Sequence, residues 1–140
     1  MKNSLDMYCV TDKDLDFLRD LDYKLAAVGK NNFSEKYIKC DQEDNIFYKE
    51  EYYSELTFHY WFWKNKLKNY INDDETWIGV CQKRRFWIQK KTNLDKSKNI
   101  SKKDLLKYIP EEWSGYNAVI CEPINLQVSK YSKLIKKGWR

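Results

Sequence analysis

Glycine, proline and histidine are scarce in this chain of 140 residues, which contains 4 Gly, 2 Pro and 1 His. Neither glycine-rich phosphate-binding motif, G-x-G-x-x-G or G-x-x-x-x-G-K-S/T, occurs, so nucleotide binding of the Rossmann or P-loop kind is disfavoured. The single histidine, His59, lies among tyrosines and tryptophans, where a histidine is more typical of a packed core residue than of a catalytic base. Catalysis by a Ser-His-Asp triad or by a histidine-bound metal is therefore disfavoured as well.

Long apolar runs are also missing. No segment approaches the roughly 18 apolar residues of a membrane-spanning helix, and residues 1–6 lack the apolar centre of a secretory signal. The four cysteines are widely spaced and form no C-x-x-C pair, so buried thiols in a reducing compartment explain them better than a zinc site. These absences predict one soluble domain that spans residues 1–140 and lies in the cytoplasm.

Aromatic residues and positive charge are plentiful. The 6 Trp, 11 Tyr and 6 Phe make up 16% of the chain, a composition that excludes a disordered tail. Lys and Arg number 26 against 21 Asp and Glu, and the excess is concentrated between Lys83 and Lys107, where only Asp95 and Asp104 oppose it. Such a segment suits a polyanion, a diphosphate or an anionic membrane surface. A solvated lysine-rich loop is the alternative.

Short apolar runs alternate with helical patterns along the chain. Strands are predicted at 7–11, 25–28, 37–40, 76–81 and 118–121, with 76–81 as a central strand. Helices are predicted at 15–21, at 51–70, from Ser101 to Ile109 and at 128–135. This alternation is typical of an α/β fold, a mostly parallel sheet with helices on both faces.

The segment 51–70 has the clearest helical pattern. Large apolar residues recur there at steps of three and four: Tyr52, Leu56, Tyr60, Trp63, Leu67 and Tyr70. This spacing places them on one face of a helix, so Leu56 and Trp63 are expected to be nearly fully buried. Phe58, Trp61 and Phe62 make the other faces apolar too, which predicts a helix inside a layered core.

Ligands of parallel α/β sheets bind at the carboxyl ends of the strands. The residues expected at that edge are Asp12, Lys13, Gly29, Asp44, Asn45, Gln82 to Arg85, and Glu122. Arg84 and Arg85 offer planar guanidinium groups suited to a diphosphate. Because neighbouring residues of a strand face opposite sides, both can serve one crevice only if a turn or bulge begins near Gln82. Basic residues on a solvated strand edge are the alternative.

The acidic run Asp73-Asp74-Glu75 is similar to a D-x-D signature that holds a divalent cation on a nucleotide diphosphate. It precedes its strand, however, whereas a metal site in such a sheet should follow one. A solvated loop is therefore expected here and no metal ligand is assigned. Whether a divalent ion such as Mn²⁺ or Mg²⁺ takes part in function stays open.

Five segments stand in an order similar to that of a known family. They read Y-C-V-T-D-K at 8–13, D-N-I at 44–46, Y-S-E-L-T at 53–57, Y-W-F-W-K-N at 60–65 and I-G-V-C-Q-K-R-R-F at 78–86. This order resembles the bacterial domain of unknown function 4422 family, whose members are often described as capsular or exopolysaccharide biosynthesis proteins and glycosyltransferases. The resemblance runs from Tyr8 to about Leu126.

The chain departs from the family pattern at three points. Many members carry H-Y-R-R where this chain has Gln82-Lys83-Arg84-Arg85, so a histidine role is not transferred. Many have glycine where Glu43 precedes the Asp-Asn pair. Members are usually longer, which predicts an N-terminal fragment or truncated member with a sheet that is incomplete at its C-terminus.

The resemblance implies a GT-A-like transferase that uses a nucleotide-sugar donor and a glycan acceptor. Combined with the edge rule above, it leads us to expect nucleotide and sugar binding by Thr11, Asp12, Lys13, Asp44, Asn45 and Gln82. Arg84 and Arg85 would hold the diphosphate and stabilise its developing charge. Glu55 would be a structural acceptor or a base for the acceptor hydroxyl. Association with the inner face of the membrane and self-association through an open sheet edge are further expectations.

Two other interpretations remain. A nucleic-acid-binding module would use the basic segment together with Phe86, Trp87 and Trp113, but it should display exposed aromatic residues, and the pattern at 51–70 predicts buried ones. No nucleic-acid partner is therefore expected. A non-catalytic remnant is the third interpretation.

Overall fold

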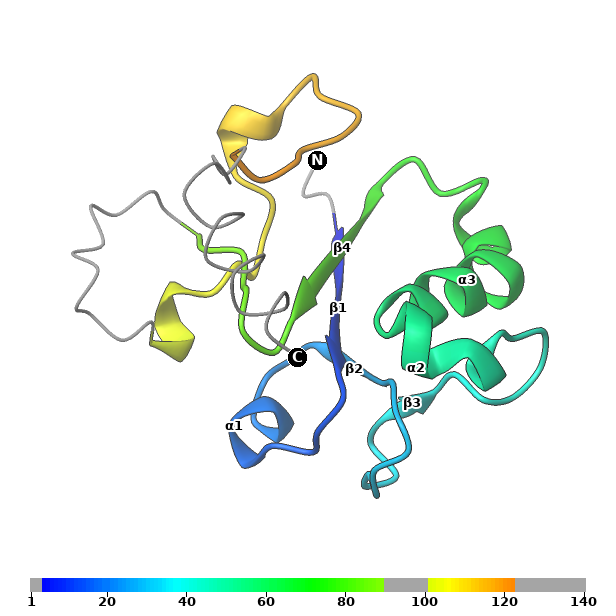
Figure 1. Cartoon of the computed structure of the whole chain (residues 1–140). Helices are drawn as coiled ribbons and strands as arrows, with labels where there is room; N and C mark the ends of the chain where they lie inside the picture. Colours follow the sequence, from blue (N-terminus) through cyan, green and yellow to red (C-terminus); the bar gives the residue numbers. More distant parts are fainter. Residues whose placement is uncertain (1–3, 90–100, 123–140) are drawn as a thin grey trace, which may run out of the picture. The chain divides into compact units, whose positions relative to one another are not determined.

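A four-stranded sheet forms the centre of the computed structural model, which describes residues 4–89 and 101–122 (Figure 1). The strands are β1 (Ser4–Thr11), β2 (Lys24–Ala27), β3 (Ile38–Lys39) and β4 (Thr76–Gln82). They lie in the order β3-β2-β1-β4, and every neighbouring pair is parallel. This arrangement confirms the predicted α/β class and four of the predicted strands.

Two predictions about strands are wrong. Strand β4, which was predicted to be central, lies at an edge of this sheet. The central position belongs to β1, which pairs with β4 along most of its length and with β2 on its other side. Residues 118–121 form no strand, and Ile120 there is 82% exposed. An apolar run alone does not make a strand, because its backbone groups also need a neighbouring strand to bond.

The chain divides into two compact units, Met1–Pro110 and Glu111–Arg140. The first contains the whole sheet. In the second, the described residues form one short 3₁₀ helix, η4 (Glu111–Trp113). The predicted helix at 128–135 lies outside the described residues, as do residues 90–100 of the basic segment.

The segment 51–70 is interrupted, so the prediction of one continuous helix is wrong. It follows a 3₁₀ turn η1 (Phe47–Lys49) and consists of α2 (Glu50–Tyr53), α3 (Leu56–Asn65) and a 3₁₀ turn η2 (Leu67–Tyr70). Ser54 separates the two helices with a left-handed backbone, φ +46°. The buried Thr57 restarts the helix by donating its hydroxyl to the Ser54 carbonyl at 2.6 Å.

Helix α3 packs against the sheet through its phenylalanines and Trp61 (Figure 1). The ring of Tyr8 in β1 lies 5.5 Å from that of Phe58 and 5.1 Å from that of Phe62. Leu56 and Trp63 are instead 55% and 56% exposed, so the prediction that they are buried is wrong. The helix has two apolar faces, and the spacing could not tell which of them would meet the sheet.

The other face of the sheet is covered by shorter elements. Alternation along β1 turns Met7 and Cys9 to that side, where Leu18 of α1 (Asp16–Arg19) is fully buried. Leu105 and Leu106 are also buried, directly after the 3₁₀ turn η3 (Lys102–Asp104). Ser101 caps this turn as predicted, but the prediction of a helix that continues through Leu105, Leu106 and Ile109 is wrong. The Tyr23 hydroxyl donates to the Leu106 carbonyl at 2.7 Å and ties this segment to β2.

Candidate functional site

The carboxyl end of β1 turns sharply at Thr11. This side chain is buried, and its hydroxyl donates to the Lys13 carbonyl at 2.7 Å. The Lys13 amide in turn donates to the Thr11 hydroxyl oxygen at 3.1 Å. Thr11 therefore shapes the turn from inside, while Asp12 projects from the edge of the sheet.

Asp12 is paired with Lys83, the first residue beyond β4. The Lys83 ammonium donates to Asp12 Oδ1, and the Lys83 amide bonds to the Val10 carbonyl at 3.3 Å. The Lys83 side chain is mostly buried at 16% exposure, whereas that of Asp12 is 46% exposed. The hydrogen bond from Lys83 lowers the pKa of Asp12 below its usual value. Asp12 is consequently ionised at neutral pH.

Two further segments meet Asp12 near Gly29, which directly follows the short apolar run of β2. Gly29 has φ +92°, and a Cβ there would lie 3.6 Å from Glu50 Oε1 and 3.7 Å from the Asp12 Cβ. The Asn31 side chain donates to the Asp12 carbonyl at 2.6 Å. The loops after β1 and β2, the start of α2 and the end of β4 thus converge at the carboxyl edge of the sheet.

A tight turn begins at Gln82. Such a turn was required if Arg84 and Arg85 were both to face one crevice. The Gln82 and Arg85 amides and carbonyls bond reciprocally at 3.1 and 3.0 Å, which places Lys83 and Arg84 at the tip. Arg84 and Arg85 are exposed. Among the residues that the structure describes, neither guanidinium forms an ion pair. Lys83, and not an arginine, holds Asp12.

Asp44 and Asn45 belong to a different set of contacts. Asp44 accepts from the Tyr60 hydroxyl at 3.1 Å, and its carbonyl accepts from Asn65 at 2.9 Å. Asn45 accepts from the Phe47 amide at 3.0 Å and stabilises its own turn. These contacts fasten the 41–46 loop to α3. Beside the loop lies an open hollow of about 470 Å³, lined among others by Lys39, Gln42, Trp61 and Lys66.

Glu55 occupies the N-cap position of α3, where its side chain makes no capping hydrogen bond. The charge of Glu55 acts on His59, one turn along the helix. His59 is itself exposed, so it is not the packed core residue that the sequence suggested. Burial of part of its ring nevertheless lowers the pKa of His59.

The acidic run Asp73-Asp74-Glu75 lies at the amino end of β4, opposite the converging loops. Asp73 accepts from the Glu75 and Thr76 amides, both at 3.0 Å, and so closes the turn into the strand. Within residues 4–89 and 101–122, no three His, Cys, Asp or Glu side chains gather as metal ligands. The described residues therefore do not fit a dedicated cation site.

Asp14 anchors the loop that follows Asp12. Its carboxylate accepts from Arg19 at 2.8 Å and from the Ser34 amide at 3.2 Å. The hydrogen bond from Arg19 is the main cause that lowers the pKa of Asp14 to about 2. Asp14 does not cap α1, whose N-cap is Leu15; it ties the loop after β1 to the loop that leads to β3.

The chain can be assigned to a family of domains. A family model for the domain of unknown function DUF4422 matches residues 6–137, so the chain belongs to the DUF4422 family. The comparisons with curated proteins and with solved structures gave no match. In the part of the chain that the structure describes, no helix has the length and apolar character needed to span a membrane.

Sequence reasoning selected Asp12 and the 82–85 turn but missed Asn31 and Glu50. Gly29 was a usable signal, because a glycine after a buried strand often permits close approach of other groups. Asn31 and Glu50 stand in no recognisable motif. They reach Asp12 and Gly29 only because two loops fold back across the end of the sheet.

Proposed function

We propose that this chain is the donor-binding part of a GT-A-like glycosyltransferase that uses a nucleotide sugar in capsular or exopolysaccharide assembly. Membership of the DUF4422 family and the resemblance of the motifs support this proposal. The observation that carries it is the convergence of Asp12, Gly29, Glu50 and Lys83 at the carboxyl ends of parallel strands. Ligands of such sheets bind at this edge.

The charges at the edge suit a diphosphate. Lys83, Arg84 and Arg85 supply positive groups within one turn, and both guanidinium groups are exposed and able to bind a phosphate with two parallel hydrogen bonds. Asp12 keeps Lys83 in place but does not pair with Arg84 or Arg85, so the charges of both arginines stay available. Gly29, which carries no side chain, leaves room beside the Glu50 carboxylate for a ribose or sugar hydroxyl.

The transfer step uses only residues at this carboxyl edge of the sheet. An acceptor hydroxyl oxygen forms a bond to the anomeric carbon of the donor, and the bond from that carbon to the diphosphate breaks. The nucleoside diphosphate leaves with the electron pair, and its charge is stabilised by Lys83, Arg84 and Arg85. The hydroxyl proton passes to solvent water, because the Glu50 carboxylate is engaged by the donor. Because the described residues do not fit a metal site, no step passes through a metal.

The proposal is tested by calorimetric titration of the chain with UDP-, GDP- and CDP-sugars, each with and without Mn²⁺. We expect one nucleotide class to bind, and we expect Lys83→Ala or Arg84→Ala to weaken that binding about tenfold or more, because each removes a charge-assisted contact of roughly 1.5–3 kcal/mol. The matched control is Lys107→Ala, an exposed lysine outside the turn. Equal losses in all three variants, or no binding of any nucleotide sugar, would contradict the proposal.

Exposure of Trp63 removes the sequence argument against a nucleic-acid-binding module. Its ring lies 5.8 Å from Tyr60 and has the Lys64 ammonium 4.1 Å above its centre. Lysines lie near Trp63, but the surface as a whole is not basic, because the adjoining segment from 41 to 55 carries Asp41, Glu43, Asp44, Glu50, Glu51 and Glu55 against Lys49 alone. Carboxylates repel the phosphates that provide most nucleic-acid affinity. We therefore retain the transferase as the proposed function.

A further inference from the structure

Four residues of the apolar stripe that the sequence placed in the core, Tyr52, Leu56, Trp63 and Leu67, are exposed, whereas Tyr70 packs against Phe62. Seven of the twelve large hydrophobic residues that are exposed in the described parts of the chain come from the segment 48–71. They are Tyr48, Tyr52, Tyr53, Leu56, Trp63, Leu67 and Ile71. Scattered exposed hydrophobic residues need no explanation, but a concentration of this kind marks an interaction surface. Nothing in the proposed transfer step uses it.

The centre of this surface is α3, where three residues share one face. Leu56, Tyr60 and Trp63 follow at steps of four and three, so their side chains lie in one row along the helix. Trp63 is held by contacts on two sides, the edge of the Tyr60 ring and the Lys64 ammonium. A large aromatic side chain that is fixed before binding makes a strong anchor, because little conformational freedom is lost on association.

The row is self-complementary about its centre. Leu56 and Trp63 are equally distant in sequence from the peptide bond between His59 and Tyr60. This bond is therefore the midpoint of the row. Two copies of α3 packed antiparallel would therefore place Trp63 of each copy against Leu56 of the other, with Tyr60 near the two-fold axis. A large side chain opposite a small one fills the space between helices better than two large ones.

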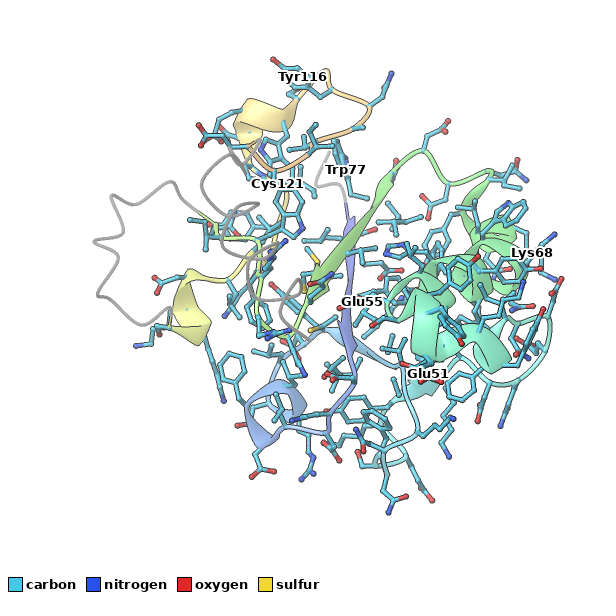
Figure 2. All side chains as sticks on the ribbon, in the orientation of Figure 1. Glu51, Glu55, Lys68, Trp77, Tyr116 and Cys121 are labelled. Atoms are coloured by element: carbon cyan, nitrogen blue, oxygen red, sulfur yellow. The ribbon has the colours of Figure 1, made fainter. Side chains whose placement is uncertain are left out.

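The two ends of the surface carry opposite charges. Glu51 and Glu55 lie at the end where α3 begins, whereas Lys64 and Lys68 lie at the end where it stops. Figure 2 shows Glu51 and Glu55 toward one end of the helical layer and Lys68 at the other. An antiparallel pair would bring the acidic end of each copy over the basic end of its partner. Parallel packing would place like charges together and is disfavoured.

We propose that this surface, centred on Leu56, Tyr60 and Trp63, binds a second copy of the same chain in a two-fold symmetric dimer with antiparallel α3 helices. A two-fold interface uses the same patch on both copies and closes after two, so the assembly does not grow further. It leaves the loops at the carboxyl edge, with Asp12 and Lys83, outside the paired patch. This contact is different from pairing through an open sheet edge.

The experiment is sedimentation equilibrium of the wild-type chain and of two charge-reversed variants. In one, Glu51→Lys and Glu55→Lys make both ends basic; in the other, Lys64→Glu and Lys68→Glu make both ends acidic. We expect a wild-type dimer and a dissociation constant at least tenfold weaker for each variant alone. An equimolar mixture of the two variants should regain dimers, because each basic end then meets an acidic one.

A wild-type dimer that each variant alone weakens and the mixture restores is expected only for self-association through opposite ends. A surface that binds nucleic acid, lipid or another protein would not restore a dimer when two variants are combined. Trp63→Ala should also weaken the dimer, while Tyr116→Ala, a change at an exposed aromatic residue in the other compact unit, should not. Circular dichroism checks that every variant is folded. A wild-type monomer at concentrations up to about 100 μM, or a mixture that stays monomeric, would overturn the proposal.

Discussion

Lys83 reaches back from the turn after β4 to bond the carboxylate of Asp12 at the end of β1. The two strands are parallel neighbours, with Val10 opposite Gln82 in the register. The pair therefore fixes the relative position of the two loops that border the candidate site. It also keeps a carboxylate and an ammonium side by side at the proposed diphosphate site.

The first prediction concerns the titration of Asp12. Because the hydrogen bond from Lys83 stabilises the ionised carboxylate, the pKa of Asp12 lies below its usual value. In Lys83→Met the pKa of Asp12 should rise toward the value of an ordinary aspartate. Carbon-detected NMR titration of the side-chain carboxyl measures both values. A pKa that is the same in the two proteins would show that the ion pair does not form in solution.

The sign of the stability effect follows from the direction of this shift. A carboxyl whose pKa is lowered by folding stabilises the native state above its unfolded pKa, and this contribution is lost as the pH falls through the folded value. The exposed Asp12 side chain is screened by solvent, so the effect on the free energy of unfolding should be at most about 1 kcal/mol. The main consequence of acid is release of the Lys83 ammonium.

The second prediction applies the same reasoning to Asp14, which has no part in the proposed chemistry. Its pKa of about 2 depends first on Arg19. Arg19→Met should raise the Asp14 pKa toward the value of a free aspartate, and the wild-type chain should lose the stability due to this contact only as the pH falls from about 4 toward 2. Urea unfolding across this pH range, compared between the two proteins, measures the difference. Parallel pH profiles would contradict the assignment.

The sequence predicted most of the sheet because buried parallel strands are short apolar runs bounded by polar residues. It also predicted the edge at which Asp12 and the 82–85 turn meet, since the ends of parallel strands share one side. It did not predict which face of α3 is buried. One face carries Phe58, Trp61 and Phe62, and another carries Leu56 and Trp63. The first face is buried because it packs against Tyr8, which belongs to a strand far away in the sequence.

Loops account for the remaining differences. The break at Ser54 requires a positive φ in a residue other than glycine, which no local pattern announces. The place of Glu50 beside Gly29 depends on the path of the whole loop from 28 to 49. Charged residues on such loops are common, so neither Glu50 nor Asn31 stands out until the fold has brought them to the site.

The third prediction separates the two faces of α3 by their stability. Phe58 is fully buried between the sheet and Trp61, so Phe58→Ala should lower the free energy of unfolding by about 3–5 kcal/mol. Trp63→Ala removes a side chain that is 56% exposed and should cost well under half as much. Urea denaturation of both variants at a concentration where the chain is monomeric makes the comparison. Similar losses would place Trp63 in the core after all.

The last prediction tests Gly29 as the point of closest approach within the candidate site. Its φ of +92° is unfavourable for any side chain, so Gly29→Ala should reduce the free energy of unfolding by about 1–2 kcal/mol. The new methyl group would also lie 3.6 Å from the Glu50 carboxylate and so occupy the space that a donor hydroxyl needs. The matched control is Gly115→Ala, which imposes a similar strain at φ +84° with no atom within 4 Å. Both variants should lose stability, but only Gly29→Ala should lose nucleotide-sugar affinity in calorimetric titration. A loss of affinity in both would trace the effect to general destabilisation, and a loss in neither would move the binding site away from this edge of the sheet.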